Sequence, residues 1–511
     1  MEEARFLGST RFGIALLLHL AQAVNYANRT CLSTAIDGSS GMAAAYGWDD
    51  GTKGLVLSSF FWSYASCQLG MGAVILRFGP RRVLITAFTV QGALALCFPL
   101  VVQQGLVFPV LIVRFLIGCM QAALTPCMVH TIAAWVPAFE SSRAYAISDC
   151  GNSVGASVAF VLTPQLMNWS SWPAPFYFMG VASLLWACIA GHSLWDSPVE
   201  HPRIRSHEVA WLAHHLAYSH KVCGAATARS HSRDGRSEGL LQETGMAASE
   251  SAASSSWTIP TKMTRLRSLL CRASVLCLPF VFFAGSWGWY VFLTFLPQYL
   301  HNQLNFDLRA SGGVAILPYV THLLGQNLAA LVADRMLSAR SLRPTVVRRL
   351  FHSGGSLGAA AALVGVIYAP DVASAVGLLA LSNLFYGFTS SGAWVAPMQI
   401  SPPYAGLLEG FANGSGNGAG IAAPLVTGWL LQSGGCPADT QGSLPPITPA
   451  CSRAWQLVFY TSAGALLTGA AIFQAFGSVD AVRLPGEARD EDVESLDQSA
   501  MAPSLREAAV Q

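Results

Sequence analysis

The feature that most constrains the fold is a series of twelve apolar runs, each long enough to cross a bilayer as a helix. A helix rises 1.5 Å per residue, so about 20 residues span the hydrocarbon core. Six runs precede and six follow one long polar insert, at 12–35, 54–76, 83–103, 106–136, 144–167, 174–195, 274–300, 312–334, 350–368, 372–397, 404–432 and 455–476. Backbone groups in lipid must be satisfied within the segment, which predicts an all-α membrane protein.

Composition excludes several other classes. Only 11% of the residues are charged, whereas soluble domains average roughly 25%. The net charge of +2 is spread over short loops and predicts no nucleic-acid polymer as a partner. The 12 cysteines form no CxxC pair, and Cys127 and His130 lack a second ligand pair, so no metal or other cofactor is expected. No nucleophile and base occur at catalytic spacing, so the chain is not expected to be an enzyme.

The polar insert divides the chain into four predicted parts. These are an N-terminal six-helix bundle at 1–195, a partly disordered cytosolic linker at 196–270, a C-terminal six-helix bundle at 271–476 and an acidic cytosolic tail at 477–511. The linker contains a helix-capable piece at 206–216 and a Ser/Ala/Gly-rich tract at 225–256 that predicts disorder. The first apolar run has no small-residue cleavage pattern, so it is predicted to be retained as a span.

Basic residues fall almost entirely in the even-numbered connections. By the positive-inside rule, both termini and the insert are then cytosolic. The residues concerned are Arg77, Arg81, Arg82, Arg143, Arg335, Arg340, Arg343, Arg348 and Arg349, against Lys53, Arg309 and Arg453 in the odd-numbered connections. On the opposite side, Cys436 and Cys451 flank a Pro-rich loop, and their spacing leaves open whether they form a disulfide. Asn168 begins a glycosylation sequon close to the membrane, and its use is equally open.

Arg114 lies inside the fourth apolar run. An arginine at the centre of a membrane helix costs roughly 2.5–3.5 kcal/mol on insertion scales, so such residues usually face a bundle interior or a wet cavity. One interpretation is an anion-binding arginine. The other is a side chain that reaches the interface or pairs with a helix carbonyl.

The six-plus-six arrangement, together with Gly72-Ala-Val-Ile-Leu-Arg-Phe-Gly-Pro-Arg-Arg82, resembles the major facilitator superfamily and its signature loop. A weaker counterpart runs from Gly325 to Arg335. The resemblance implies that Arg77 and Arg81 pair with acidic groups and helix ends to latch one state, and it makes Asp334, in the counterpart motif of the second half, an expected gating residue. The usual acid before the first arginine is replaced by Leu76, so a latch there must use another acid.

Four further stretches resemble the anion:cation symporters of solute carrier family 17, over roughly residues 10–475. They run from Trp48 to Gln68, from Trp135 to Arg143, from Ser286 to Tyr299 and from Pro403 to Asn413. This family includes sialin, the vesicular glutamate and nucleotide transporters, and plastid phosphate transporters. The resemblance implies a twelve-helix transporter of organic anions or phosphate that works by alternating access.

The resemblance also assigns roles to residues. Arg29 and Arg114 match two family arginines and are expected to bind the anion, although Arg29 alone could instead reach the interface. Fixed guanidinium charges suit carboxylate or phosphate. The other expected substrate-binding residues are Gln121, Tyr64, Trp287, Tyr290 and Asn413, and the expected gating residues include Glu140 and Arg143.

Coupling is where the chain departs from the family. Many members have a proton-carrying glutamate where this chain has Gln121, which cannot carry a proton. Glu409 and His322 are the expected replacements, with a loop ion pair and a helix-contact histidine as the respective alternatives. Leu57 and Gly285 stand where the vesicular glutamate branch has a histidine and an arginine, so glutamate is not the favoured substrate. The vesicular nucleotide branch remains an alternative.

The expected protein is therefore a monomeric, multi-pass transporter in the plasma membrane or an internal membrane. Its partners are a small anionic substrate, the lipid bilayer and a coupling proton or sodium ion. Transport is driven by an ion gradient or the membrane potential. A non-transporting receptor on the same scaffold is the alternative from another class.

Overall fold

The computed structural model describes residues 6, 8–36, 41–48, 50–212, 263–304, 312–339, 342–436 and 448–480, and these contain helices but no strand. The first half comprises α1 (Thr10–Ile36), α2 (Met42–Tyr46), α3 (Asp50–Phe78), α4 (Pro80–Val102), α5 (Val107–Gln121), α6 (Leu124–Trp135), α7 (Ser141–Asp149), α8 (Gly151–Trp169), α9 (Ala174–Ser193) and η1 (Pro198–Glu200). The second half comprises α12 (Met263–Leu270), α13 (Ala273–Leu304), α14 (Gly312–Ser338), α15 (Pro344–Ile367), α16 (Val372–Phe388), η2 (Thr389–Ser391), η3 (Ala393–Val395), α17 (Ala396–Ile400), η4 (Pro402–Tyr404), α18 (Ala405–Ser433) and α19 (Pro449–Phe476).

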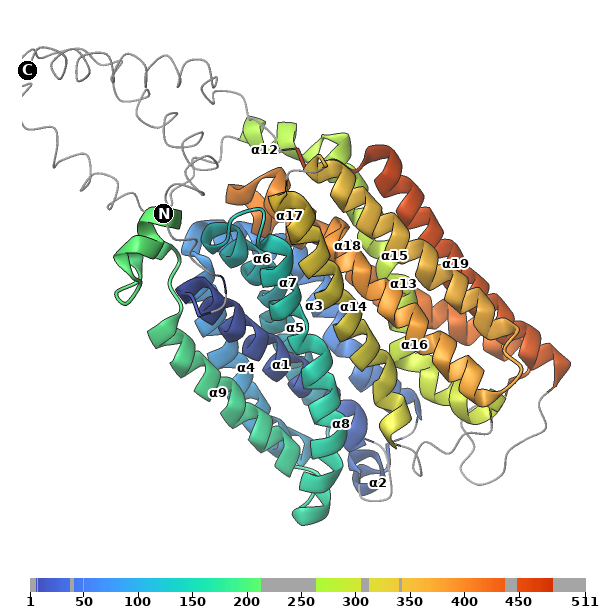
Figure 1. The fold of residues 1–511 in the computed structure, drawn as a ribbon. Coiled ribbons are helices and arrows are strands. Elements are labelled where there is room, and N and C mark those ends of the chain that lie inside the picture. The colour runs from blue at the N-terminus through green and yellow to red at the C-terminus, as the bar shows by residue number, and fades with distance from the viewer. Residues whose placement is uncertain are drawn as a thin grey trace, which may run out of the picture.

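Each of the twelve predicted runs falls on helical structure, and the all-α membrane fold is confirmed. The fourth run covers α5 and α6, the fifth covers parts of α7 and α8, and the tenth extends from α16 to α17. Figure 1 shows the long helices lying side by side, with α6, α7, α12 and α17 near one end of the bundle. We call this the basic end, because it carries Arg77, Arg143 and Arg348.

Seven of the described helical stretches are long and apolar enough to cross a membrane by themselves. They are α4, α5 with α6, α9, the first part of α13, α15, α16 with α17, and α19. Of the remaining long helices, α1, α3, α8, α14 and α18 carry more glycine and polar residues. These helices are packed against other helices over part of their length, so they need less apolar surface towards lipid.

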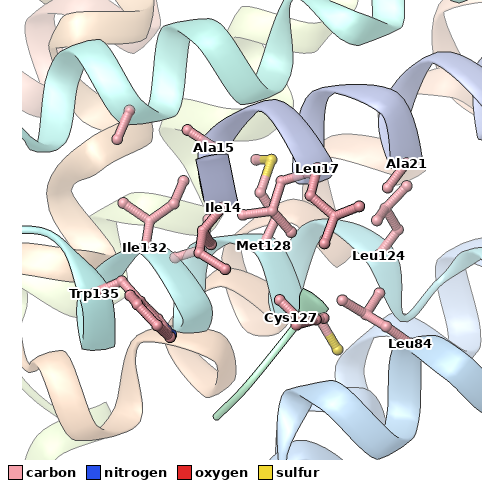
Figure 2. Close-up of a cluster of buried hydrophobic side chains, with 14 of the residues drawn as sticks. Ile14, Ala15, Leu17, Ala21, Leu84, Leu124, Cys127, Met128, Ile132 and Trp135 are labelled. Carbon is pink, nitrogen blue, oxygen red and sulfur yellow. The ribbon is translucent and has the colours of Figure 1, made fainter. Parts of the chain in front are cut away.

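The core of the first half is built around α6, whose residues are buried on nearly all sides. Figure 2 shows Leu124, Met128 and Trp135 of α6 facing Ile14 and Leu17 of α1. The Trp135 indole donates a hydrogen bond to the Trp195 carbonyl at 2.9 Å. Lipid is as apolar as these side chains, so close van der Waals packing holds the helices together.

Glycines set the closest helix contacts. A Cβ on Gly155 would lie 2.1 Å from the Ala23 carbonyl oxygen, where α8 crosses α1. A Cβ on Gly325 would lie 2.0 Å from the Leu384 carbonyl oxygen, where α14 crosses α16. Only glycine fits at either crossing, because real Cβ atoms do not approach backbone oxygens this closely.

The predicted linker begins as ordered structure on the first half. Asp196 accepts a hydrogen bond from the Arg81 backbone amide at 2.8 Å, at the start of α4. Residues 206–212 are helical, and Glu208 there contacts Arg11 of α1 at 3.2 Å. The tract predicted to be disordered, 225–256, lies outside the described residues, as does the tail beyond residue 480.

A disulfide joins Cys436, just after α18, to Cys451 in the first turn of α19. The end of α18 and the start of α19 lie at the end of the bundle opposite the basic end, so the disulfide is there too (Figure 1). Asn168 is exposed on the last turn of α8 at this same end. Its glycosylation stays a prediction.

Candidate functional site

A cavity of about 90 Å³ lies between the two halves of the bundle. By this measure one water needs roughly 10–15 Å³, so the cavity has room for several waters or a small anion. Both halves contribute to its wall, through Tyr26, Tyr64, Thr125, Tyr145, Asp149, Asn152, Ser153, Ser286, Trp289, Tyr290, His322, Tyr386, Ser390, Trp394, Asn413 and Asn417.

The wall is polar and aromatic, and much of it comes from the less apolar helices. Hydroxyl and amide groups supply hydrogen-bond donors and acceptors, while tryptophan and tyrosine rings supply flat faces. Trp289 stacks near Tyr386 with ring centroids 6.2 Å apart and lies 5.1 Å from the His322 ring. Asp149 is the only carboxyl group among the lining residues, and no lysine or arginine lines the cavity.

The α13 residues that line the cavity follow the helical period. Ser286, Trp289 and Tyr290 are spaced i, i+3 and i+4 and so share one face. Trp287 is two residues from Trp289, which turns it by about 200° on a helix of 3.6 residues per turn. It packs against Phe283 instead, with ring centroids 5.9 Å apart, so its expected place in the cavity wall was wrong.

Arg29 and Arg114 come from different helices and converge on one phenyl ring. Their guanidinium carbons lie 4.9 Å and 5.1 Å from the centroid of Phe60. The approach is possible because Gly118 of α5 faces α3, where a Cβ would lie 2.4 Å from the Phe60 carbonyl oxygen. Arg114 is only 4% exposed, so it does not reach the interface.

Neither arginine has an acidic partner among the described residues. The ion pairs there involve Arg11 and Arg143. Arg114 Nε and one terminal nitrogen of Arg29 are buried without a hydrogen-bond partner in the described part of the chain. Two turns further along α5 from Arg114, both polar atoms of the Gln121 side chain are buried and equally unpaired within it. Unsatisfied donors beside two cations are what an anion or ordered water would satisfy.

The arginine pair lies behind the cavity wall. Tyr26, Tyr64 and Tyr290 line the cavity and are also the electrostatic neighbours of Arg29. The Tyr290 hydroxyl donates to Asn417 Oδ1 at 2.6 Å, and the Asn417 amide donates to Gln68 of the opposite half. The expected residues Tyr64, Tyr290 and Asn413 therefore line the cavity, while Arg29, Arg114 and Gln121 do not.

The two expected coupling residues differ in their surroundings. Glu409 is fully buried, and both its oxygens lack a hydrogen-bond partner among the described residues. The alternative of a loop ion pair for Glu409 was therefore wrong. His322 is 8% exposed and lines the cavity, with Nδ1 unpaired in the described part of the chain.

The two halves are joined at the basic end by a cluster that closes the cavity on that side. Arg143 donates to Asp334 Oδ2 from both its backbone amide and its Nε, each at 3.0 Å. Arg348 is fully buried and donates to Ser142 Oγ at 2.6 Å and to the Ser391 carbonyl at 2.9 Å. We call these contacts the basic-end gate.

The other expected gating residues lie beside this gate. Glu140 accepts from Arg11 Nε at 2.8 Å within the first half. The Arg81 backbone amide donates to Asp196 Oδ1 at 2.8 Å, and its guanidinium donates to the Gly191 carbonyl at 2.6 Å, both within the first half. Arg77 is exposed on the last turn of α3. Its guanidinium carbon lies 5.4 Å from the centroid of the Phe78 ring.

Sequence reasoning missed several residues of the wall, above all Asp149. The available signal was a carboxylate inside the fifth apolar run, which is the same signal that identified Arg114. Tyr26, Tyr145 and Tyr386 had no such signal, because tyrosines in membrane helices are usually packing or interface residues.

Comparison with known proteins places these features among transporters. The sequence profile described as Major Facilitator Superfamily matches residues 18–408. The chain is 27% identical over 437 residues to the sodium-dependent phosphate transport protein 1, chloroplastic, of Arabidopsis thaliana, covering 86% of this chain and 74% of that protein. It is 28% identical to the ascorbate transporter, chloroplastic, of the same plant, covering 77% of this chain and 65% of that protein.

A solved structure of the proton:xylose symporter XylE bound to 6-bromo-6-deoxy-D-glucose has a similar fold. The TM-score is 0.64 at 15% identity, with 93% of this chain and 98% of the symporter covered. At this identity the likeness concerns the arrangement of the helices and not the substrate.

Proposed function

The chain belongs to the major facilitator superfamily, and from that premise we propose that it is a secondary transporter of small organic anions or inorganic phosphate. The relatives named for phosphate and ascorbate transport support an anion as the substrate. The protein works by alternating access, in which the two halves rock around a central site.

The observation that carries this proposal is the pair formed by the buried Arg114 and the half-buried Arg29, neither of which has an acidic partner among the described residues. Two neighbouring like charges that are largely withdrawn from water are costly in a membrane protein unless something compensates them. A carboxylate or phosphate does so, since each guanidinium donates parallel hydrogen bonds to such groups. Arg29 and Arg114 therefore stabilise the bound anion.

The cavity provides the path to this pair. Tyr26, Tyr64 and Tyr290 line the cavity and are electrostatic neighbours of Arg29, so the positive potential of the arginine acts on an anion in the cavity. A volume of about 90 Å³ suits a small anion. Pockets that bury drug-sized ligands are several times larger, at ~300–1,000 Å³, so the geometry gives no added support to a nucleotide substrate.

Orientation and coupling complete the proposal. The basic end and both termini face the cytosol by the positive-inside rule, so the basic-end gate closes the cytosolic side of the cavity. A proton or sodium ion accompanies the anion, and the protein acts as a monomer.

Flux measurements with the purified full-length protein in proteoliposomes test this function. Labelled phosphate, ascorbate, sialate, glucuronate, glutamate and ATP are supplied in turn, and uptake of at least one small anion is expected. Arg114→Ala should reduce that uptake to background, because the anion loses a charged donor.

The matched control is Arg453→Ala, which removes an exposed arginine in the first turn of α19 and should leave uptake unchanged. If no anion of the panel enters with the wild-type protein, the receptor alternative is favoured. If Arg114→Ala transports at the wild-type rate, the arginine pair is not the anion site.

A further inference from the structure

We infer that Asp149 is the group that carries the coupling proton, and that it replaces the acid missing at Gln121. This inference rests on the proposed anion transport and specifies how a gradient drives it. Asp149 is the last residue of α7 and lies inside the fifth apolar run. It is the one carboxyl group among the described residues that line the cavity.

The surroundings of Asp149 contain donors but no cation among the described residues. The Asn152 side-chain amide donates to Asp149 Oδ1 at 2.8 Å. No arginine, lysine or histidine of the described chain lies within 4.0 Å of its carboxylate oxygens. The titratable groups that face it are Tyr26 of α1, Tyr145 and Cys150 beside it in the chain, His322 of α14, Tyr386 of α16 and Glu409 of α18.

Access to water separates Asp149 from Glu409. Glu409 has 0% of its surface accessible, and it does not line the cavity. A carboxyl group without contact to water has no route for rapid proton exchange. Asp149 borders a cavity with room for several waters, which can deliver and remove a proton.

The hydrogen bond from Asn152 and the cavity together allow two charge states. In the ionised state, the Asn152 amide stabilises the carboxylate. In the neutral state, the proton on one carboxyl oxygen is a donor towards the cavity. A water molecule transfers this proton to Asp149 when the cavity opens on one side and accepts it back on the other, so no other reactant is needed.

Electrostatics then couples proton and anion. An anion in the cavity and an ionised Asp149 carry like charges in a space of about 90 Å³, so anion binding favours the neutral carboxyl group. By linkage, a neutral Asp149 raises anion affinity by the same factor. The two ligands therefore load and unload together, which is symport.

Asp149→Asn tests this assignment, because asparagine keeps the shape and removes the proton site. The full-length protein is reconstituted in proteoliposomes that contain a pH-sensitive dye, and the probe is the anion that gave wild-type uptake in the panel above. We expect anion-induced proton influx to fall at least tenfold, while exchange of labelled for unlabelled anion persists. Asp371→Asn, at the exposed N-cap of α16, is the matched control and should behave as wild type.

Glu409→Gln is the discriminating variant and should retain anion-induced proton influx. If it abolishes the influx while Asp149→Asn retains it, the assignment to Asp149 is overturned. Absence of anion flux in the wild-type protein would instead overturn the proposed function itself, so the two failures are distinguishable.

A second variant keeps the inference testable if Asp149→Asn does not fold. Asn152→Ala removes the donor that stabilises the ionised carboxylate, so the pH midpoint of anion uptake should move to higher pH. An unchanged midpoint in a correctly folded Asn152→Ala protein counts against Asp149 as the proton carrier.

Discussion

The ion pair between Arg143 and Asp334 is predicted to hold the basic-end gate closed, and Asp334→Asn isolates its charge. Asparagine can still accept the hydrogen bond from the Arg143 backbone amide, which in the structure spans 3.0 Å. What the variant loses is the attraction of the carboxylate for the Arg143 guanidinium and for the nearby Arg348 guanidinium. Arg348 and its hydrogen bonds to Ser142 and Ser391 remain in place.

The size of the effect follows from burial. The Asp334 side chain is 1% exposed, whereas the Arg143 side chain is 31% exposed and can turn towards water. Breaking a buried pair costs about 3–5 kcal/mol, and surface pairs contribute roughly 0–1 kcal/mol. An intermediate figure of about 2 kcal/mol shifts the ratio of closed to open gates by about 30-fold, since each 1.4 kcal/mol is a factor of ten.

Distances between spin labels measure this shift directly. Labels on Ala138 and Ser338, which are exposed at the basic end on opposite halves, report the opening of the gate. A long-distance population should grow in Asp334→Asn, and Arg143→Ala combined with it should add little, because the pair is already broken. Asp371→Asn serves as the control. A distance distribution identical to wild type in Asp334→Asn would refute the role of this ion pair in the gate.

Two further predictions concern packing and pH. Gly72→Ala should disfavour the closed basic end and slow transport, because the new Cβ would lie 2.4 Å from the Leu407 Cα. Spin-label distances and anion uptake measure the two effects. Wild-type values of both would contradict the prediction. Burial raises the pKa of the Asp196 carboxyl above its usual range, so the ionised form is penalised in the folded protein. As pH falls from 7 through that raised pKa towards the unfolded value of about 3.9, the wild type should gain thermal stability relative to Asp196→Asn, and a gap that stays constant or reverses would contradict this.

The fold was largely predictable from the sequence, because a membrane restricts the chain to helices of a set length. Hydropathy locates all twelve runs, and the position of Arg114 inside an apolar run predicts a side chain that faces other helices, as its 4% exposure confirms. The i, i+3, i+4 spacing of Ser286, Trp289 and Tyr290 on α13 predicts a shared face. Trp287 falls outside that spacing.

Tertiary contacts were not predictable, and they decide what each buried polar group does. Position along α18 is compatible with a pair between Glu409 and a loop arginine, yet the two arginines of the basic-end gate have other partners: Arg143 pairs with Asp334, and Arg348 donates to hydroxyl and carbonyl groups. No pattern along one helix records which acid a distant arginine selects.

In the proposed mechanism, the anion site and the proton site use different residues. A carboxylate within contact distance of Arg29 and Arg114 would pair with them and compete with the substrate anion for the same donors. Gln121 carries no charge, so it leaves the arginine pair available to the anion. Asp149 lines the cavity, which neither arginine does, and forms no ion pair with them, so in this proposal its charge acts on an anion in the cavity without neutralising the arginine pair. A chain that has lost the acid beside its arginines can therefore still couple transport to protons, provided that another carboxyl group shares water with the substrate path.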